Sequence, residues 1–591
     1  FIIPLDNRGE WYRYHHLFQG LLQQRLSVEM TPDQIANLHR KASAWFDEQG
    51  LLDEALHHAL KAGDLDLAAR LMIAGLRDVI NREDRLTLER WLKLLPEELI
   101  QQQPGLMMIR AWALQFSWRL DLQAQLLQQI EELLEAGGGA SLPADELQFL
   151  RGQILGLRAQ QAYFNNQPML AIEFCQQVLA LLPPSWTFVR GGAMLFLGMS
   201  MQASDQALEA ERLLLAEYES CGDKTDVYAL LLLRSLAFIY LKTGQLDQTR
   251  RIAQVQLQGA TNRRIRIMQN WADWFLGVLC YHRNEVQSCA QHFSQIVKNR
   301  YSAQVSTYRD AVAGLALIHQ IQGESSEAWR MVESISQFDL QQRGSEDKRT
   351  CSLRARLMLL QGDLEGASHW ADAFTGPPPD QPFMWLEEPQ VTRVRILVAR
   401  GSDADLRLAL KNLGVLDEIA DRTYNTRYKI EILALHALAL DALGETSAAN
   451  IELKQALDLA HPGGFIRVFV DLGVPMQEML CRLAKQDHFA ETIRHILAAF
   501  PEDDVNLVGS KSTARYPSLG ISTLAEPLTT RELEVLVLLR GPLSIKEIAL
   551  KLNISYATAR RHTINIYGKL GVNQRWNAVA KAEELNILPP R

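Results

Sequence analysis

A recurring turn pattern, repeated about every forty residues, constrains the fold of this chain more than any other feature. Each copy has a small or polar turn residue, then a polar step, and in most copies an alanine. The copies begin at Asn165, Gly244, Asn284, Gly323, Gly362 and Gly444, and the first and last intervals each span two repeats. One helix pair cannot bury its own apolar face, whereas stacked pairs form a continuous core with a concave inner surface. The pattern predicts a tetratricopeptide-like array, with Gly244 and Gly323 ending helices in the left-handed backbone conformation.

A second pattern, a helix-turn-helix, occupies residues 544–570 near the C-terminus. Ser544 is placed to cap a helix over 545–551, in which the apolar residues recur at helical spacing. After a short turn, Ser555 is placed to cap a second helix that continues to about Lys569. In such motifs the second helix presents its side chains to the major groove of DNA.

Helices are also predicted on both sides of this motif, one after a Thr529 cap and one over the run GVNQRWNAVAKA. Four short helices can bury one small core. The segment resembles the LuxR-type DNA-binding domain through Pro527, Leu528, Thr529, Arg531, Glu532, Glu534, Val535, Leu536, Glu547, Ile548, Ala549, Leu552, Ser555, Thr558, His562, Tyr567, Lys569, Leu570, Gly571, Val572, Arg575 and Ala578. The family usually carries Thr-Val-Lys where this chain has Thr558, Ala559 and Arg560, so the charge is kept and the base preference is left open.

The resemblance implies that double-stranded promoter DNA is bound by a set of polar and basic side chains. The predicted set is Lys546, Ser555, Thr558, Arg560, Arg561, His562, Lys569 and Arg575. Arg560 is expected to contact a base or phosphate, whereas Lys546, Lys569 and Arg575 are expected to contact phosphate. Thr558 is expected to bond a phosphate at the helix N-terminus, and His562 to pack and contact the backbone. The alternative is that these charges form only a solvated face.

The N-terminal residues predict a wing followed by a helix. Two β-like runs, residues 1–5 and 11–14, flank a polar turn, and a helix begins near His15. This run resembles the winged-helix segment of the large ATP-dependent LuxR-type regulators of the STAND class, the MalT-like group. The resemblance implies that His15 touches a bound nucleotide when the nucleotide-binding domain is present. Alternatively, His15 faces solvent at a helix start.

The nucleotide-binding domain itself is not predicted in this chain. A phosphate-binding loop needs G-x-x-x-x-G-K-[ST], and the nearest imitation, at Gly509, lacks the glycine before the lysine and a preceding strand. We therefore expect no cofactor in this chain, with ATP or ADP implied for the full-length relatives. Because the first residue, Phe1, is not Met, the natural protein is expected to begin upstream. Paired carboxylates, a nucleophile elbow and a metal motif are also not found, so an enzyme is not predicted.

Charge distribution and composition agree with a regulator whose DNA contact is local. The chain carries a net charge of −8, but residues 526–591 contain ten Lys or Arg and six Asp or Glu. A basic C-terminal module is thus joined to an acidic body. The six cysteines show no C-x-x-C pair, which is typical of reduced thiols in a cytoplasmic protein. No apolar run is long enough for a membrane span.

The concave side of the array is where we expect a small-molecule inducer. Trp271, Trp274 and Tyr281 form an aromatic cluster at helical spacing, and aromatic faces stack on flat or apolar ligands. The alternative for each of these residues is core packing. A sensor array in a MalT-like activator implies self-association on activation and contact with RNA polymerase. The alternative function is an interaction scaffold, in which the array binds a protein partner and the DNA module localises it.

These patterns predict an all-α chain of five consecutive parts. They are a winged-helix remnant (1–32), a helical arm (33–98), a tetratricopeptide-like sensor (99–500), a flexible linker (501–525) and a LuxR-type helix-turn-helix domain (526–591).

Overall fold

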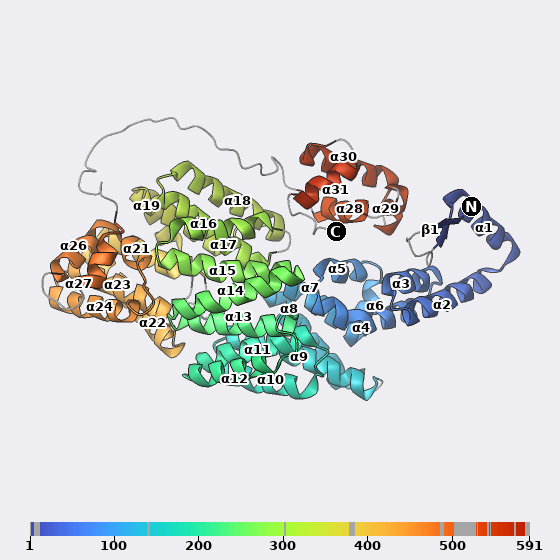
Figure 1. Ribbon diagram of the computed structural model, residues 1–591, viewed down its shortest axis with the longest axis horizontal. Helices are drawn as coiled ribbons and strands as arrows, with labels where there is room; N and C mark the ends of the chain where they lie inside the picture. The colour runs from blue at the N-terminus through green and yellow to red at the C-terminus, as the bar shows by residue number, and fades with distance from the viewer. Residues whose placement is uncertain are drawn as a thin grey trace. The chain divides into compact units, whose positions relative to one another are not determined.

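The computed structural model describes residues 2–4, 12–138, 142–300, 303–376, 385–484, 490–500, 528, 530–540, 543, 545–552, 554–572 and 575–584. Its residues form two compact units (Figure 1). Unit 1 contains residues 1–163 and 170–197, and unit 2 contains 164–169 and 198–591. The predicted linker, Gly509, and the predicted caps Ser544 and Thr529 lie outside the described residues.

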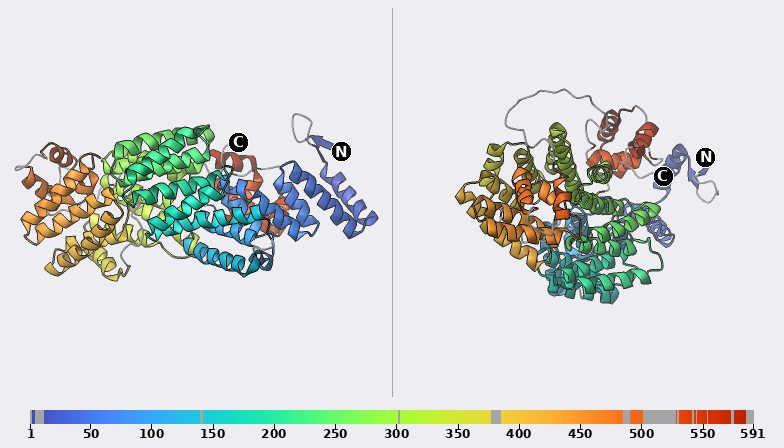
Figure 2. Two further views of the ribbon diagram at one scale, coloured as in Figure 1. Left: turned by 90° about the horizontal axis from the view of Figure 1, so that it is seen from below. Right: turned by 60° about the vertical axis from the view of Figure 1, so that its left-hand side comes forward.

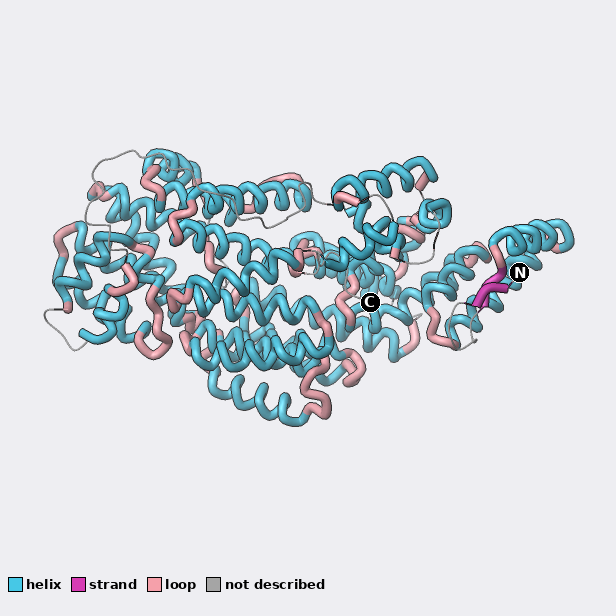
Figure 3. Tube along the Cα trace, turned by 45° about the horizontal axis from the view of Figure 1, so that its top comes forward, coloured by secondary structure: helices cyan, strands magenta, loops and turns pink. Residues whose placement is uncertain are grey.

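Unit 1 begins with the predicted wing. Strands β1 (Ile2–Pro4) and β2 (Tyr12–Tyr14) pair antiparallel, with Ile3 opposite Arg13, and helix α1 (His16–Glu29) follows directly. Apart from this hairpin, the described part of the chain in Figure 3 consists of helices and their connecting turns.

Further helices follow in chain order, and the last three of them each have one end in unit 2. They are α2 (Pro32–Glu48), α3 (Leu52–Lys61), α4 (Leu65–Asn81), α5 (Arg85–Leu92), α6 (Glu97–Gln102), α7 (Pro104–Phe116), α8 (Leu120–Leu133), the π-helical turn η1 (Leu134–Gly138), α9 (Ala144–Phe164), α10 (Pro168–Leu181) and α11 (Thr187–Gln202). Local caps set several starts: Thr31 and Gln34 form a capping box at α2, and the Asp64 carboxylate accepts from the Leu67 amide at α4.

Unit 2 continues the helix pairs and ends in a separate four-helix group. Its helices are α12 (Ala207–Ser220), α13 (Val227–Lys242), α14 (Leu246–Arg263), α15 (Arg266–His282), α16 (Val286–Lys298), α17 (Val305–Ile321), α18 (Ser325–Arg343), α19 (Lys348–Leu360), α20 (Leu364–Ala373), α21 (Pro389–Arg400), α22 (Asp403–Arg422), α23 (Thr426–Ala442), α24 (Thr446–Ala460), α25 (Arg467–Val470), α26 (Gly473–Leu483), α27 (Ala490–Leu497), α28 (Thr530–Leu539), α29 (Ile545–Lys551), α30 (Tyr556–Leu570) and α31 (Arg575–Glu584). From α13 to α19 each helix packs against the next, and they lie side by side in both views of Figure 2.

Left-handed residues mark the turn inside each helix pair. Gly244 and Gly323 both end helices with positive φ, as predicted. The full series falls 39 to 43 residues apart at Asn166, Asp205, Gly244, Asn284, Gly323, Gly362, Gly401 and Gly444. The prediction of Asn165 was wrong by one residue. The copies implied by the two double-length intervals fall at Asp205 and Gly401, two positions that were not named from the sequence. Asn and Asp tolerate this conformation because their short side chains can hydrogen-bond locally.

The first and second helices of each pair differ in burial. Residues 229–242 of α13, 268–282 of α15 and 306–318 of α17 are all buried. In contrast, α16 buries one stripe, Cys289, Phe293 and Ile296. The first helices are covered on a second side because α23 packs on α13, α25 packs on α15, and the Leu386 amide, just before α21, donates to Asp310 of α17. The expected concave face is therefore covered by later parts of the same chain.

The last four helices share one small core, as predicted. Helices α29 and α30 fall within one residue of their predicted bounds. The buried residues are Leu528, Val535, Leu536, Leu539, Ile548, Ile566, Leu570, Ala578, Val579 and Ala582. Ala559, the departure from the usual valine, is also fully buried. This core fixes the position of α30 against α28, α29 and α31.

None of the described helices is both long and apolar enough to cross a membrane. Within the described residues, no cluster of three or more His, Cys, Asp or Glu side chains is arranged to hold a metal ion.

Candidate nucleic-acid interface and array pocket

Helix α30 is held at both ends by local signals in its sequence. The Ser555 hydroxyl accepts a hydrogen bond from the Thr558 amide at 3.1 Å, which caps the first turn as predicted. The two hydroxyl oxygens also lie 2.7 Å apart. At the other end, Gly571 adopts a left-handed conformation that stops the helix. The Thr558 hydroxyl is thus already bonded within the cap.

The exposed face of α30 carries two arginines whose charges are not neutralised. Arg560 and Arg561 are exposed, and neither forms an ion pair within the described part of the chain. One helical turn further, Ile564 and Asn565 are exposed on the same face. Sequence reasoning did not select these two residues, although their spacing of four from the arginines would have identified them. This face can present charge, an amide and an apolar side chain to a groove.

The other predicted basic contacts differ in what they touch. Lys546 is exposed on α29. The Lys569 ammonium instead lies 2.9 Å from the Glu532 carboxylate, and these side chains are only 11% and 3% exposed. Arg575 donates to the backbone carbonyls of Leu539, at 2.7 Å, and Leu543. Lys569 and Arg575 therefore tie α28 to α30 and α31, and their predicted phosphate contacts stay untested.

One of the two predicted histidines, His562, lies on helix α30, and the other, His15, immediately precedes α1. His562 is half-buried, and its Nδ1 has no hydrogen-bond partner within the described residues, which agrees with a packing position. His15 immediately precedes α1 and its side chain does not cap that helix. Its contact with a nucleotide remains a prediction.

The predicted inducer-site aromatics lie inside the array. Trp271 and Trp274 are buried on α15 and pack against Phe238 and Phe275. Trp385, just before α21, covers them with ring centroids at 6.4 and 5.5 Å. The Trp274 indole donates to Asp310 at 2.7 Å. In this arrangement both tryptophans serve as core, the alternative considered from the sequence.

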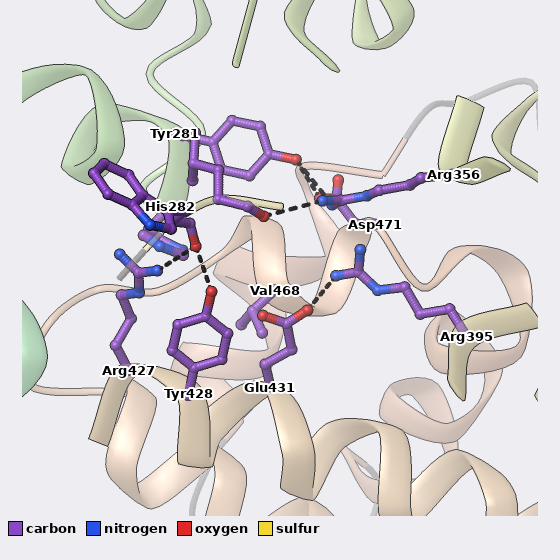
Figure 4. Close-up of a pocket in the computed structure, with 11 residues that line it drawn as sticks. Tyr281, His282, Arg356, Arg395, Arg427, Tyr428, Glu431, Val468 and Asp471 are labelled. Atoms are coloured by element: carbon purple, nitrogen blue, oxygen red, sulfur yellow. Dashed lines mark hydrogen bonds and ion pairs between the residues drawn. The ribbon is translucent and has the colours of Figure 1, made fainter. Parts of the chain in front are cut away.

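Tyr281, the third predicted aromatic, lines a pocket that combines charged side chains with aromatic and aliphatic ones (Figure 4). The pocket is formed by residues that are distant in sequence: Tyr281, His282, Arg356, Trp385, Leu386, Arg395, Arg427, Tyr428, Glu431, Val468 and Asp471. The Tyr281 hydroxyl donates to Asp471 at 2.5 Å. Sequence reasoning did not bring these residues together, because no local motif links them.

Most charges in the pocket are matched. Arg356 lies 3.1 Å from both Glu387 and Asp471, and Arg395 forms an ion pair with Glu431. Burial opposes ionisation of Asp471, but the neighbouring Arg467 and Arg356 hold its pKa below the ordinary value. Burial raises the pKa of Tyr281 and lowers that of His282 well below the usual range, so both groups are neutral at pH 7.

Comparison with protein-family models matches three segments of the chain. Residues 152–486 match the MalT-like TPR region, residues 526–582 match the bacterial regulatory proteins of the luxR family, and residues 1–35 match the MalT winged helix domain. The first match covers more than half of the chain.

A sequence relative agrees with the family models, whereas the similarity to solved structures is low. The HTH-type transcriptional regulator MalT of Cronobacter sakazakii is 27% identical over 621 aligned positions, which cover 99% of this chain. This chain spans 65% of the length of that relative. Among solved structures, the APC/C hetero-tetramer Cut9-Hcn1 aligns with 82% of this chain and 99% of its own, at 12% identity and a TM-score of 0.29. A monomeric mutant of IFIT1 with Gppp-AAAA aligns with 73% and 92%, at 13% identity and a TM-score of 0.36.

Proposed function

Because the chain belongs to the family that has the MalT-like TPR region, we propose that it is the effector-sensing and DNA-binding part of a transcriptional activator. The observation that carries the proposal is the exposed face of α30. Its two arginines, Arg560 and Arg561, lie on the second helix of a helix-turn-helix within a luxR-family segment. Unpaired cations on a groove-sized helix are what phosphate and base recognition require.

In the proposed mechanism, an effector binds in the array and changes the packing between early and late repeats. ATP acts on the nucleotide-binding domain implied for the full-length relatives, His15 just before α1 senses the bound nucleotide, and the activated form self-associates. Several α30 helices then reach a promoter together and recruit RNA polymerase. This activity assigns the protein to the bacterial cytoplasm.

The array pocket supports a small-molecule effector over the alternative of a protein scaffold. Tyr281, Trp385 and Tyr428 line the pocket beside charged groups, and its volume of about 20 Å³ admits one small chemical group of a ligand. A partner protein would instead need a broad accessible surface, and the inner sides of α13, α15 and α17 are covered.

DNA binding is tested by selecting sites for the purified chain from a random double-stranded pool. The enriched and scrambled sequences are then titrated by fluorescence anisotropy. We expect a preferred sequence bound by roughly 10³-fold or more over scrambled DNA at physiological salt. The control is the double variant Arg560→Ala, Arg561→Ala, whose fold is checked by circular dichroism. A folded double variant that keeps the full preference would refute the proposed role of α30.

A further inference from the structure

The array pocket contains polar groups that the protein itself does not satisfy. His282 is 7% exposed, and neither of its ring nitrogens has a hydrogen-bond partner within the described residues. The same holds for the Nε of Arg395, although the tip of that side chain pairs with Glu431. Buried donors and acceptors are nearly always bonded, because an unmade bond costs roughly 1–3 kcal/mol.

Arg427 adds a charge that no carboxylate matches. It is 5% exposed, donates to the Trp385 carbonyl at 2.7 Å, and lies 4.7 Å from the Tyr428 ring centre. It forms no ion pair with any described residue. Arg356 and Arg395 in the same pocket both have carboxylate partners, so Arg427 is an exception among its neighbours.

The nearby acids among the described residues form no ion pair with Arg427. Asp310 lies within electrostatic range of it, but its carboxyl accepts hydrogen bonds from the Trp274 indole and the Leu386 amide. Asp471 is shared by Arg356 and Arg467, and Glu431 is held by Arg395. Burial raises the pKa of Glu388 to about 8, so this carboxyl is mostly protonated at pH 7. Lys242, whose pKa is lowered to about 7 by burial and by Arg427, adds no negative charge. Among the residues that line the pocket, three arginines (Arg356, Arg395 and Arg427) face two carboxylates (Glu431 and Asp471), and several nitrogen atoms have no hydrogen-bond partner within the described residues.

We propose that this pocket binds the oxyanion group, phosphate or carboxylate, of a small effector, with Arg427 as the charge partner and His282 and Arg395 Nε as further hydrogen-bonding groups. The proposal rests on the sensor role proposed for the array and names the chemical class of its ligand. The oxyanion would contact side chains from α15, α21 and α23 at once. Figure 4 shows Arg427 and His282 together on one side of the pocket.

Occupancy of this pocket would also affect how the repeats pack. The Ile466 amide, just before α25, donates to the His282 carbonyl at 2.7 Å, and Arg283 donates to the Gly463 carbonyl at 2.9 Å. An anion between α15 and α23 therefore acts where the late repeats meet the early ones. A ligand that binds one packing better than another shifts the population toward it.

Isothermal titration calorimetry on the full chain tests the proposal. The probes are inorganic phosphate, acetate, and glucose 6-phosphate beside glucose, with sodium chloride matching the ionic strength. We expect binding of at least one anion and none of glucose. If glucose 6-phosphate binds more tightly than inorganic phosphate, the oxyanion belongs to a phosphorylated metabolite. If acetate binds most tightly, the oxyanion is a carboxylate.

Two pocket variants and one control locate the site. Arg427→Gln keeps a donor for the Trp385 carbonyl but loses the charge, and should weaken anion binding by about tenfold or more. His282→Phe removes two unsatisfied nitrogens beside Phe465, and should weaken binding while the thermal midpoint stays equal or rises. Arg560→Gln, on α30, should leave anion binding unchanged.

Three results would overturn the proposal. The first is that no anion gives a heat of binding, and the second is that both pocket variants fold and bind the anion as tightly as the parent chain. The third is that only Arg560→Gln loses anion binding. If one pocket variant has a lowered thermal midpoint of unfolding, the anion affinity of the other variant decides the test. The outcome is separable from DNA binding, because the site selection described above can succeed or fail whatever the pocket binds.

Discussion

Arginines inside the array and arginines on α30 carry the same guanidinium group but differ in burial and in ion pairing. Arg309 is 2% exposed and lies 2.6 Å from Asp339, which is fully buried. Arg560 and Arg561 are exposed, with no ion pair to a described residue. An arginine matched by a buried carboxylate holds helices together, whereas an unmatched one is available to a ligand. Arg427 is instructive because it is buried like the first kind and unmatched like the second.

The largest effect should come from breaking the buried pair. Asp339→Ala leaves the Arg309 guanidinium in the core without this partner, and should reduce the free energy of unfolding by about 3–5 kcal/mol. The measurement is a urea titration followed by circular dichroism. Glu219→Ala is the control in the same unit, because Glu219 is 76% exposed and its pair with Lys224 is worth less than about 1 kcal/mol. A similar loss of unfolding free energy in both variants would contradict the idea that a buried ion pair contributes more stability than an exposed one.

Lys569 tests whether a basic residue of the DNA-binding module can be structural. Lys569→Ala leaves the buried Glu532 without its ammonium partner and should destabilise the module by about 1–3 kcal/mol. Hydrogen exchange of α28 and α30 amides, measured by mass spectrometry, should become faster. Lys546→Ala is the matched control: protection stays unchanged, and the salt dependence of DNA binding loses about one phosphate contact. The reverse pattern would return Lys569 to the DNA-contact set.

Arg560 tests the unmatched class directly. Arg560→Ala should weaken binding to the selected DNA site by roughly 1–3 kcal/mol if it contacts a base, and relax the preference at one position. The salt-titrated anisotropy assay measures both effects with selected and scrambled DNA. Equal affinity of variant and parent for the selected site at every salt concentration would show that this arginine does not read the groove.

Features set by residues close together in the sequence could be predicted, whereas contacts between residues far apart in the sequence could not. The turns at Gly244 and Gly323 and the Ser555 cap were predictable, because a turn or a cap is decided by a few adjacent residues. Asp205 was missed because an aspartate at a turn is a weaker signal than glycine.

The burial of Trp271 and the pairing of Lys569 depended on remote residues. Trp385 covers Trp271 from 114 positions away in the numbering, and Glu532 meets Lys569 across 37 residues. A single sequence shows the residue types but not which of them meet. The pocket around Arg427 was unpredictable for the same reason.

The smallest expected effect concerns two histidines in unit 1 whose protonation is disfavoured in the folded state. The Nδ1 atoms of His39 and His58 lie 2.8 Å apart, so both rings cannot carry a proton there. Burial and then Lys61 lower the pKa of His39, and burial followed by His39 and His57 lowers that of His58. At this pair the unfolded state therefore binds more protons than the folded state below about pH 6.5, and the contribution of the pair to the local stability of α2 and α3 falls as the pH decreases through that range.

Hydrogen exchange of α2 and α3, corrected for its intrinsic pH dependence, should show this loss of protection between pH 7 and pH 5.5. His58→Gln should flatten the profile, because the variant has no second imidazole to protonate. His369→Gln, in unit 2, is the control and should leave the exchange of α2 and α3 unchanged. A parent whose α2 and α3 gain protection on acidification would mean that the histidine pair prefers the charged form. The rule drawn from the arginines, that a partly buried charge needs an opposite partner, would then fail for this pair.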